Sequence, residues 1–297
     1  MIKQLKKVFA LSLLALPFSG CTSLSLGIAN TPAHFFKGAV IKDIIFDTKT
    51  ELALDIYQPK GQTKEPLPVI VFFYGGSWSF GDKSDYAFVA SYLADQGYVV
   101  VVPNYRLYPD VRFPAFVEDG AHALNWVHAS IDSYAGNPNQ IFISGHSAGA
   151  HIGSLLTAGP EEFGVNKDTQ DAIKGFAGLA GPYSFIPKAA EFKAIFESAA
   201  ADDYRPMQAT SYIDGSEPPM FLQYGEDDKT VYPINVERMQ AEVKRHNGCV
   251  AVKKYEGLNH VDMVGVFSVF KRYQAPVAKN MVSFFNEIQN NKVSCNE

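Results

Sequence analysis

The sequence lacks the positive charge that binding to nucleic acid requires. Its 26 lysines and arginines are outnumbered by 31 aspartates and glutamates, which gives a net charge of −5. A polyanionic partner demands a clustered basic face, so we expect no nucleic-acid partner. Hydrophobic residues make up 47% of the chain and charged residues only 19%, a balance that excludes a disordered protein and allows one large core.

The chain also lacks internal repeats and any Ser/Gly/Pro-rich linker or charge block that would divide it. We therefore predict one domain, over residues 41–291, preceded by a linker over residues 21–40.

An apolar run long enough to span a bilayer is missing from the N-terminal region. The run Val8–Phe18 is too short, and it follows a segment with three lysines and precedes small residues. This order is typical of a secretory signal, which we predict over residues 1–20.

Cys21 stands directly after Phe18-Ser19-Gly20, a sequence that resembles a bacterial lipoprotein box, although Phe18 replaces the usual leucine. The resemblance implies that Cys21 is acylated and becomes the new N-terminus. Because Thr22 rather than aspartate follows, it also implies an outer-membrane protein facing the periplasm, held only by its lipid. An ordinary cleavable signal, with a periplasmic or secreted product, is the alternative.

Cysteines are few, and only Cys249 and Cys295 remain after Cys21. An exported protein meets an oxidising compartment, where these two could form a disulfide. Their separation in space does not follow from the sequence, so a bridge and two unpaired thiols both stay open.

The order of predicted elements is that of an α/β domain. Two alternating stretches between Ile41 and Tyr57 predict an antiparallel pair of strands. Further strands are predicted by apolar runs or by shorter strand patterns. Continuous apolar runs are typical of strands buried on both faces of a parallel sheet. The predicted strands are Val69–Phe73, Tyr98–Val102, Ile141–Ile143, Phe176–Leu179, Met220–Tyr224 and Val250–Tyr255. Helical spacing lies between and after them, over Asp85–Gln96, Phe116–Ser130, Ala148–Thr157, Ile234–His246 and Ala275–Gln289.

This alternation predicts a mostly parallel central sheet with helices on both faces. The rhythm breaks over residues 182–218, where aromatic residues, alanines and prolines show no crossover pattern. Ligands of open α/β sheets bind beyond the carboxyl ends of the strands, so we expect this segment to form a small cap over a substrate pocket.

The segment 145–149 reads GHSAG and matches the G-x-S-x-G pattern of a nucleophile elbow. A predicted strand precedes it and a predicted helix follows, which is the context that the pattern requires. Ser147 is therefore the candidate nucleophile.

A serine hydroxyl needs a base, and in this arrangement the chain order is serine, acid, histidine. His260 lies in a glycine-containing loop after the last predicted strand, whereas His246 lies near the end of an amphipathic helix. We predict His260 as the base.

Three carboxylates, Glu226, Asp227 and Asp228, follow the preceding strand. Loop spacing favours Asp228 as the acid, then Asp227, then Glu226.

An oxyanion hole of backbone N–H groups completes such a site. One donor comes from the residue after the nucleophile, here Ala148. The others come from the loop after an earlier strand, and we predict them at Gly75, Gly76 and Ser77 in the sequence YGGSW.

These motifs, together with NYRLYP at residues 104–109, Phe113-Pro114 and Glu118-Asp119, make residues 40–290 similar to the bacterial carboxylesterase branch of α/β hydrolases, which includes feruloyl-esterase-like and kynurenine-formamidase-like enzymes. The resemblance implies an α/β-hydrolase fold with a small cap. It also implies that Arg106, Glu118 and Asp119 are structural ion-pair partners. Tyr74 stands where the family usually has a histidine, which bears on loop geometry.

The sequence thus predicts a serine carboxylesterase that hydrolyses small esters through an acyl-enzyme and uses no metal or cofactor. Two alternatives remain: an arylformamidase-type amide hydrolase, and a non-catalytic surface binding protein on the same fold. The oligomeric state and the ester's two halves do not follow from the sequence.

Overall fold

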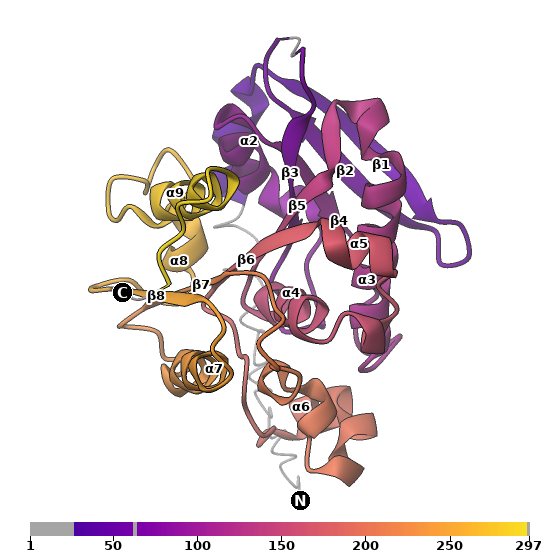
Figure 1. Cartoon of the computed structure of the whole chain (residues 1–297), viewed down its shortest axis with the longest axis vertical. Helices are drawn as coiled ribbons and strands as arrows, with labels where there is room; N and C mark the ends of the chain where they lie inside the picture. Colours follow the sequence, from indigo (N-terminus) through magenta and orange to yellow (C-terminus); the bar gives the residue numbers. More distant parts are fainter. Residues whose placement is uncertain (1–26, 62–63, 296–297) are drawn as a thin grey trace, which may run out of the picture.

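The computed structural model describes residues 27–61 and 64–295, so the predicted signal and Cys21 lie outside the described residues. An eight-stranded sheet runs through the molecule in the order β1-β2-β4-β3-β5-β6-β7-β8 (Figure 1). The strands are β1 (Ala39–Asp47), β2 (Leu52–Gln58), β3 (Leu67–Phe73), β4 (Val99–Pro103), β5 (Gly136–His146), β6 (Ile173–Leu179), β7 (Met220–Gly225) and β8 (Val250–Tyr255).

The antiparallel part of the sheet is confined to one edge. β1 pairs antiparallel with β2, and β2 pairs antiparallel with β4. Every other neighbouring pair, from β4–β3 to β7–β8, is parallel. The carboxyl ends of six parallel strands therefore meet at one side of the sheet, where loops can converge on a site.

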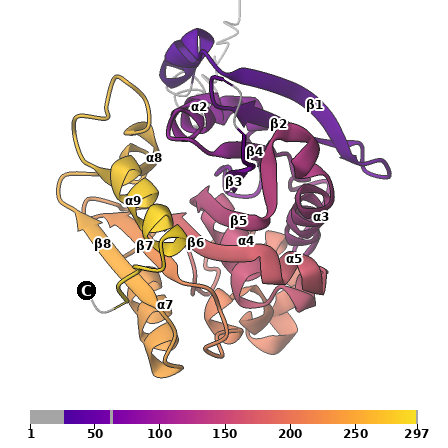
Figure 2. The same ribbon diagram turned by 45° about the horizontal axis from the view of Figure 1, so that its top comes forward.

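Helices cover both faces of the sheet. Figure 2 shows α2 (Ala87–Asp95) and α9 (Val277–Gln289) on one side, and α3 (Ala115–Ser130), α4 (Ala148–Ala158) and α7 (Ile234–Arg245) on the other. The apolar residues of α9 recur at helical spacing and are buried, at Val277, Ala278, Met281, Phe284 and Phe285. The helix that follows Ser147, α4, is buried along its whole length, so its sequence shows no polar face.

Short helices fill the segment between β6 and β7. They are α6 (Ala190–Ile195) and the 3-10 helices η5 (Glu197–Asp202), η6 (Arg205–Met207) and η7 (Ala209–Ser211), which gather beneath α4 in Figure 1. Two further short helices, α5 (Lys167–Ala172) and α8 (Asp262–Gly265), were not predicted from the sequence. Over the described ranges, no helix is long and apolar enough to cross a membrane.

A disulfide joins Cys249 to Cys295, which decides the question that the sequence left open. Cys249 immediately precedes β8, and Cys295 belongs to the tail after α9. The bond therefore fastens the C-terminal tail to the edge strand of the sheet.

Candidate active site

Ser147 lies on a sharp turn between β5 and α4. Its φ of 55° and ψ of −121° are outside the usual regions for a side-chain-bearing residue. The flanking glycines allow this turn: a Cβ on Gly145 would lie 2.5 Å from the Gly149 carbonyl, and a Cβ on Gly149 would lie 2.1 Å from the Phe73 oxygen. Such strained positions cluster at functional sites.

The structure brings Ser147, His260 and Asp228 into one hydrogen-bonded chain. The distance from Ser147 Oγ to His260 Nε2 is 2.8 Å, and that from His260 Nδ1 to Asp228 Oδ2 is 2.7 Å. With a proton on Nδ1, the imidazole donates to the carboxylate and accepts the Ser147 hydroxyl proton at Nε2. This is the arrangement that activates a serine nucleophile.

Burial separates the three neighbouring carboxylates. The Asp228 side chain is 0% exposed, whereas Glu226 and Asp227 are exposed to solvent. Oδ1 of Asp228 accepts the N–H groups of Thr230 (2.8 Å) and Val231 (2.9 Å). Burial by itself raises the pKa of a carboxyl group, but the hydrogen bond from His260 and these N–H donors outweigh it and hold the pKa of Asp228 below its ordinary value. Asp228 is thus an anion at neutral pH.

The sequence assigned no chemical role to His146, which precedes the serine. Its Nε2 lies 3.0 Å from the backbone oxygen of His260 and its ring lies 4.9 Å from the His260 ring. Burial, with the neighbouring His260, lowers the pKa of His146 to about 3, so the ring is neutral and its Nε2–H donates to that oxygen. His146 is therefore a positioning residue for the loop that carries His260; only its place beside the serine marks it in the sequence.

His151 joins the elbow helix to the cap. Its Nε2 lies 2.7 Å from the Met207 oxygen, and its ring packs edge-on against Trp78 and Phe196. Burial lowers the pKa of His151 to about 4. A neutral ring here connects α4 with η6 without placing a charge in the aromatic cluster.

The predicted oxyanion loop follows β3, as expected, but its members differ. The Gly75 N–H donates to the Tyr86 hydroxyl (3.2 Å), so, unlike the prediction, Gly75 is not among the candidate donors to an oxyanion. In the described part of the chain, the N–H groups of Gly76, Ser77 and Ala148 have no protein acceptor. These three stay available to an anionic oxygen.

Tyr74, the residue that departs from the family histidine, braces this loop by packing. Its ring stacks on Tyr105 with centroids 4.4 Å apart, and it also stacks on Tyr86. The Tyr105 hydroxyl donates to the Tyr74 backbone oxygen at 2.8 Å.

The ion pair expected from the sequence forms between Arg106 and Asp119. The guanidinium and the backbone N–H of Arg106 both donate to the buried carboxylate, with the shortest distance 2.7 Å. Glu118, the third expected partner, is exposed, and no ion pair of its carboxylate occurs within residues 27–61 and 64–295.

A cavity of about 540 Å³ opens beside Ser147. Its walls come from the oxyanion loop, from residues 182–192 of the predicted cap and from residues 230–238. Trp78, Phe185 and Phe192 form an aromatic wall, in which the Trp78 and Phe185 rings are stacked. The expected cap segment thus contributes to the walls of the cavity beside Ser147.

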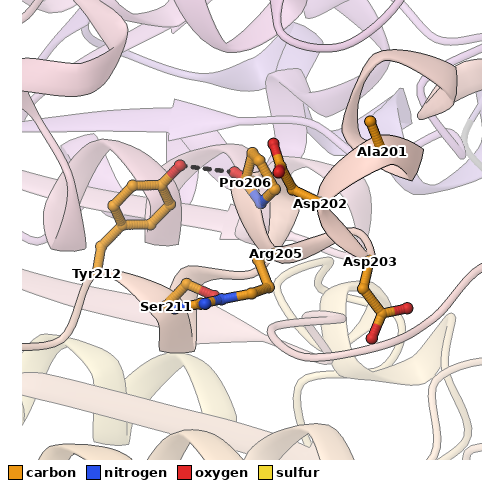
Figure 3. A pocket seen from close by; sticks show the side chains of 7 residues that line it. All are labelled: Ala201, Asp202, Asp203, Arg205, Pro206, Ser211 and Tyr212. Carbon is orange, nitrogen blue, oxygen red and sulfur yellow. Dashed lines mark hydrogen bonds between the residues drawn. The ribbon is translucent and has the colours of Figure 1, made fainter.

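A second hollow, of about 510 Å³, lies within the cap and is lined by residues of η5, η6 and η7 (Figure 3). The Tyr212 hydroxyl donates to the Pro206 oxygen at 2.9 Å, and Arg205 extends toward Ser211. Within the described residues, its lining includes none of Ser147, His260 and Asp228, and it shares no residue with the lining of the cavity beside Ser147. We assign it no role in catalysis.

The sheet order, the elbow and the site between strands and cap define an α/β hydrolase, as the sequence predicted. The BD-FAE family model matches residues 54–243, and the chain belongs to this family.

Relatives of this chain include esterases. The chain is 28% identical over 250 residues to a probable isoprenylcysteine alpha-carbonyl methylesterase of Oryza sativa subsp. japonica (77% of this chain, 60% of the relative). It is 28% identical over 210 residues to esterase LipC of Mycobacterium tuberculosis (63% and 52%). The chain thus spans between half and three fifths of these relatives' length.

Solved structures share the fold at low identity. A truncated carbohydrate esterase from gut microbiota superposes with a TM-score of 0.73 at 18% identity, covering 86% of this chain and 98% of that one. An inhibited esterase B from Lactobacillus rhamnosis gives 0.73 at 17% identity, covering 92% and 97%. At this identity the likeness concerns the fold alone.

Proposed function

We propose that the protein is a serine carboxylesterase that hydrolyses small carboxylic esters. The observation that carries the proposal is the continuous chain of hydrogen bonds from Asp228 through His260 to Ser147, at the edge of a largely apolar cavity. Family membership and the esterase names of several relatives support it.

In the proposed reaction, Ser147 Oγ attacks the ester carbonyl while its proton passes to His260 Nε2. The negative charge that develops on the carbonyl oxygen is held by the N–H groups of Gly76, Ser77 and Ala148. The imidazolium, stabilised by Asp228, then returns the proton to the departing alcohol. Water, deprotonated by the same histidine, attacks the acyl-serine and releases the acid.

The test is Ser147→Ala, assayed with 4-nitrophenyl acetate and with a fluorophosphonate probe. We expect the variant to fold, to lose nearly all hydrolysis and to escape labelling, whereas the wild type is labelled at Ser147. Substantial turnover by the variant would contradict the proposal. A parallel assay with N-formylkynurenine distinguishes formamide from ester hydrolysis, and a wild type inactive toward both would favour the non-catalytic alternative.

We also propose that the protein is exported and lipidated at Cys21. The leader over residues 1–20 supports export, and so does the Cys249–Cys295 disulfide, because such bonds persist in oxidising compartments. Growth with an alkyne-labelled fatty acid should tag the wild type and leave Cys21→Ser untagged. A freely released, untagged wild type would instead indicate an ordinary signal.

A further inference from the structure

The cavity beside Ser147 carries positive charge at its mouth. Two cations, Lys188 from the cap and Arg238 from α7, line it, and both are exposed. Among the residues that the structure describes, no carboxylate lines the cavity, and none pairs with either cation. The protein as a whole is acidic, so this local positive charge runs against its overall charge.

The Arg238 side chain is held toward the cap. Its Nη1 lies 3.5 Å from the Ser184 backbone oxygen, and the neighbouring Asn235 accepts the Ser184 N–H at 3.1 Å. These contacts connect the first turns of α7 to the cap beside the cavity. They leave most of the guanidinium's five N–H donors to other acceptors.

Exposed apolar side chains surround the same mouth. Ile186, Tyr232 and Ile234 line the cavity although they are 52%, 64% and 44% exposed. Apolar groups that are exposed together at a cavity mark a surface that a ligand covers. The ligand that fits has an apolar body against these side chains and the Trp78 wall, and a negative charge at the cations.

We propose that the preferred substrates are esters with an apolar body and an anionic group, such as a carboxylate, which Arg238 and Lys188 bind while Ser147 attacks the ester carbonyl. This inference rests on the proposed function and specifies its substrate class. A guanidinium matches a carboxylate through two parallel N–H donors, and a neighbouring ammonium adds a second charge.

The experiment uses substrate pairs that differ only in charge. On the acyl side, the mono(4-nitrophenyl) ester of adipic acid is compared with the 4-nitrophenyl ester of adipic acid monoamide. On the alcohol side, 4-acetoxyphenylacetate is compared with 4-acetoxyphenylacetamide. For each pair, kcat/KM for the anionic ester is divided by kcat/KM for the amide, in the wild type and in each variant. Comparing this ratio between the wild type and a variant cancels the intrinsic reactivity of the two esters.

We expect Arg238→Gln to lower this ratio about tenfold in at least one pair, mainly through KM, since a hydrogen bond to a charged group is lost. Lys188→Gln should lower it less, and the double variant most. The wild-type ratio should also fall as salt rises from 0.05 to 0.5 M, because exposed charges are screened.

Arg245→Gln and Lys193→Gln are the matched controls. They remove the same charge from α7 and from the cap, outside the cavity lining, and should keep the wild-type ratio. The inference would be overturned if Arg238→Gln and Lys188→Gln gave the same ratios as the controls. In that case the amide probes would still report esterase activity. Failure of all four probes would instead overturn the proposed function.

Discussion

At the scale of single residues, burial distinguishes the carboxylate that binds His260 from its two exposed neighbours. Position matters more than charge in this loop, because only Asp228 reaches the histidine. We predict that Asp228→Asn lowers kcat by about 10⁴ with little change in KM, since the amide no longer fixes the tautomer or stabilises the imidazolium. Steady-state kinetics with a 4-nitrophenyl ester measures this.

The two exposed neighbours provide the comparison. Asp227→Asn and Glu226→Gln should keep kcat within about tenfold of the wild type, because they change a nearby charge without breaking the hydrogen bond. An inactive Asp227→Asn beside an active Asp228→Asn would move the triad acid by one residue.

The buried histidines make stability depend on pH. The pKa of His151 is about 4 in the folded protein and near its ordinary value of 6.5 in the unfolded chain, so between these values only the unfolded chain takes up the proton. Above pH 6.5, His151 is neutral in both states and does not lower the free energy of unfolding. As pH falls from 6.5 toward 4, proton uptake by the unfolded chain lowers that free energy. The expected decline is about 1.4 kcal/mol per pH unit.

Urea unfolding between pH 7.5 and 5 tests this. His151→Gln keeps an N–H donor for the Met207 oxygen but does not titrate, so the slope of its unfolding free energy against pH should be shallower than that of the wild type. An unchanged slope would mean that His151 takes up its proton in the folded protein. His146, with a pKa of about 3, continues to contribute in both proteins.

At the scale of elements, helices with a long periodic face and strands with long apolar runs could be predicted from the sequence. β3, β4, α3 and α7 lie within two residues of their predicted limits. Short helices such as α5, α6 and α8 could not be predicted, because fewer than two turns carry little periodicity and depend on tertiary packing. β5 begins five residues before its apolar run, because Gly136 already pairs with Leu67 of β3 and the register then shifts before Ile141 pairs with Val69.

For the site, the chain order of motifs was enough to nominate Ser147, His260 and Asp228. It could not show that Gly75 donates to a tyrosine, nor that Arg238 and Lys188 converge at the cavity. Arg238 and Lys188 belong to segments 50 residues apart, and the Gly75 contact depends on how the loop after β3 folds back on Tyr86, so no local sequence pattern records either.

The 3-10 helix η2 (Lys83–Tyr86), which follows the oxyanion loop, is anchored by a buried cation. Lys83 Nζ lies 2.7 Å from Asp55 and 2.6 Å from Asp43, and Asp55 is completely buried. We predict that Lys83→Met costs about 3–5 kcal/mol of unfolding free energy, because it leaves the Asp55 charge buried without its partner. Urea unfolding at pH 7 measures the loss.

Removing both charges should recover much of that loss: the double variant Lys83→Met with Asp55→Leu is expected to be more stable than Lys83→Met alone. Lys167→Met, which breaks an exposed pair with Asp171, is the control and should leave the unfolding midpoint unchanged. Equal effects of Lys83→Met and Lys167→Met would contradict the anchoring role.

At the scale of the whole molecule, the Cys249–Cys295 bond closes a loop that contains β8, His260 and α9. We predict that Cys295→Ser lowers the unfolding free energy by about 2–4 kcal/mol, the usual effect of releasing a loop of this size. Thermal or urea unfolding with and without reductant measures it. Reductant should destabilise the wild type and have no effect on the variant, and a wild type insensitive to complete reduction would contradict the prediction.

The cavity and the reactive groups come from different parts of the chain. The proposed triad stands beyond the ends of core strands, whereas most of the cavity wall comes from residues 182–192 and 230–238. Substitutions in the former segment can alter which ester fits without moving the three reacting side chains. Evolution, or a mutagenesis library, can therefore change the shape of the cavity there while the hydrogen-bonded chain from Asp228 to Ser147, and the reaction proposed for it, stay intact.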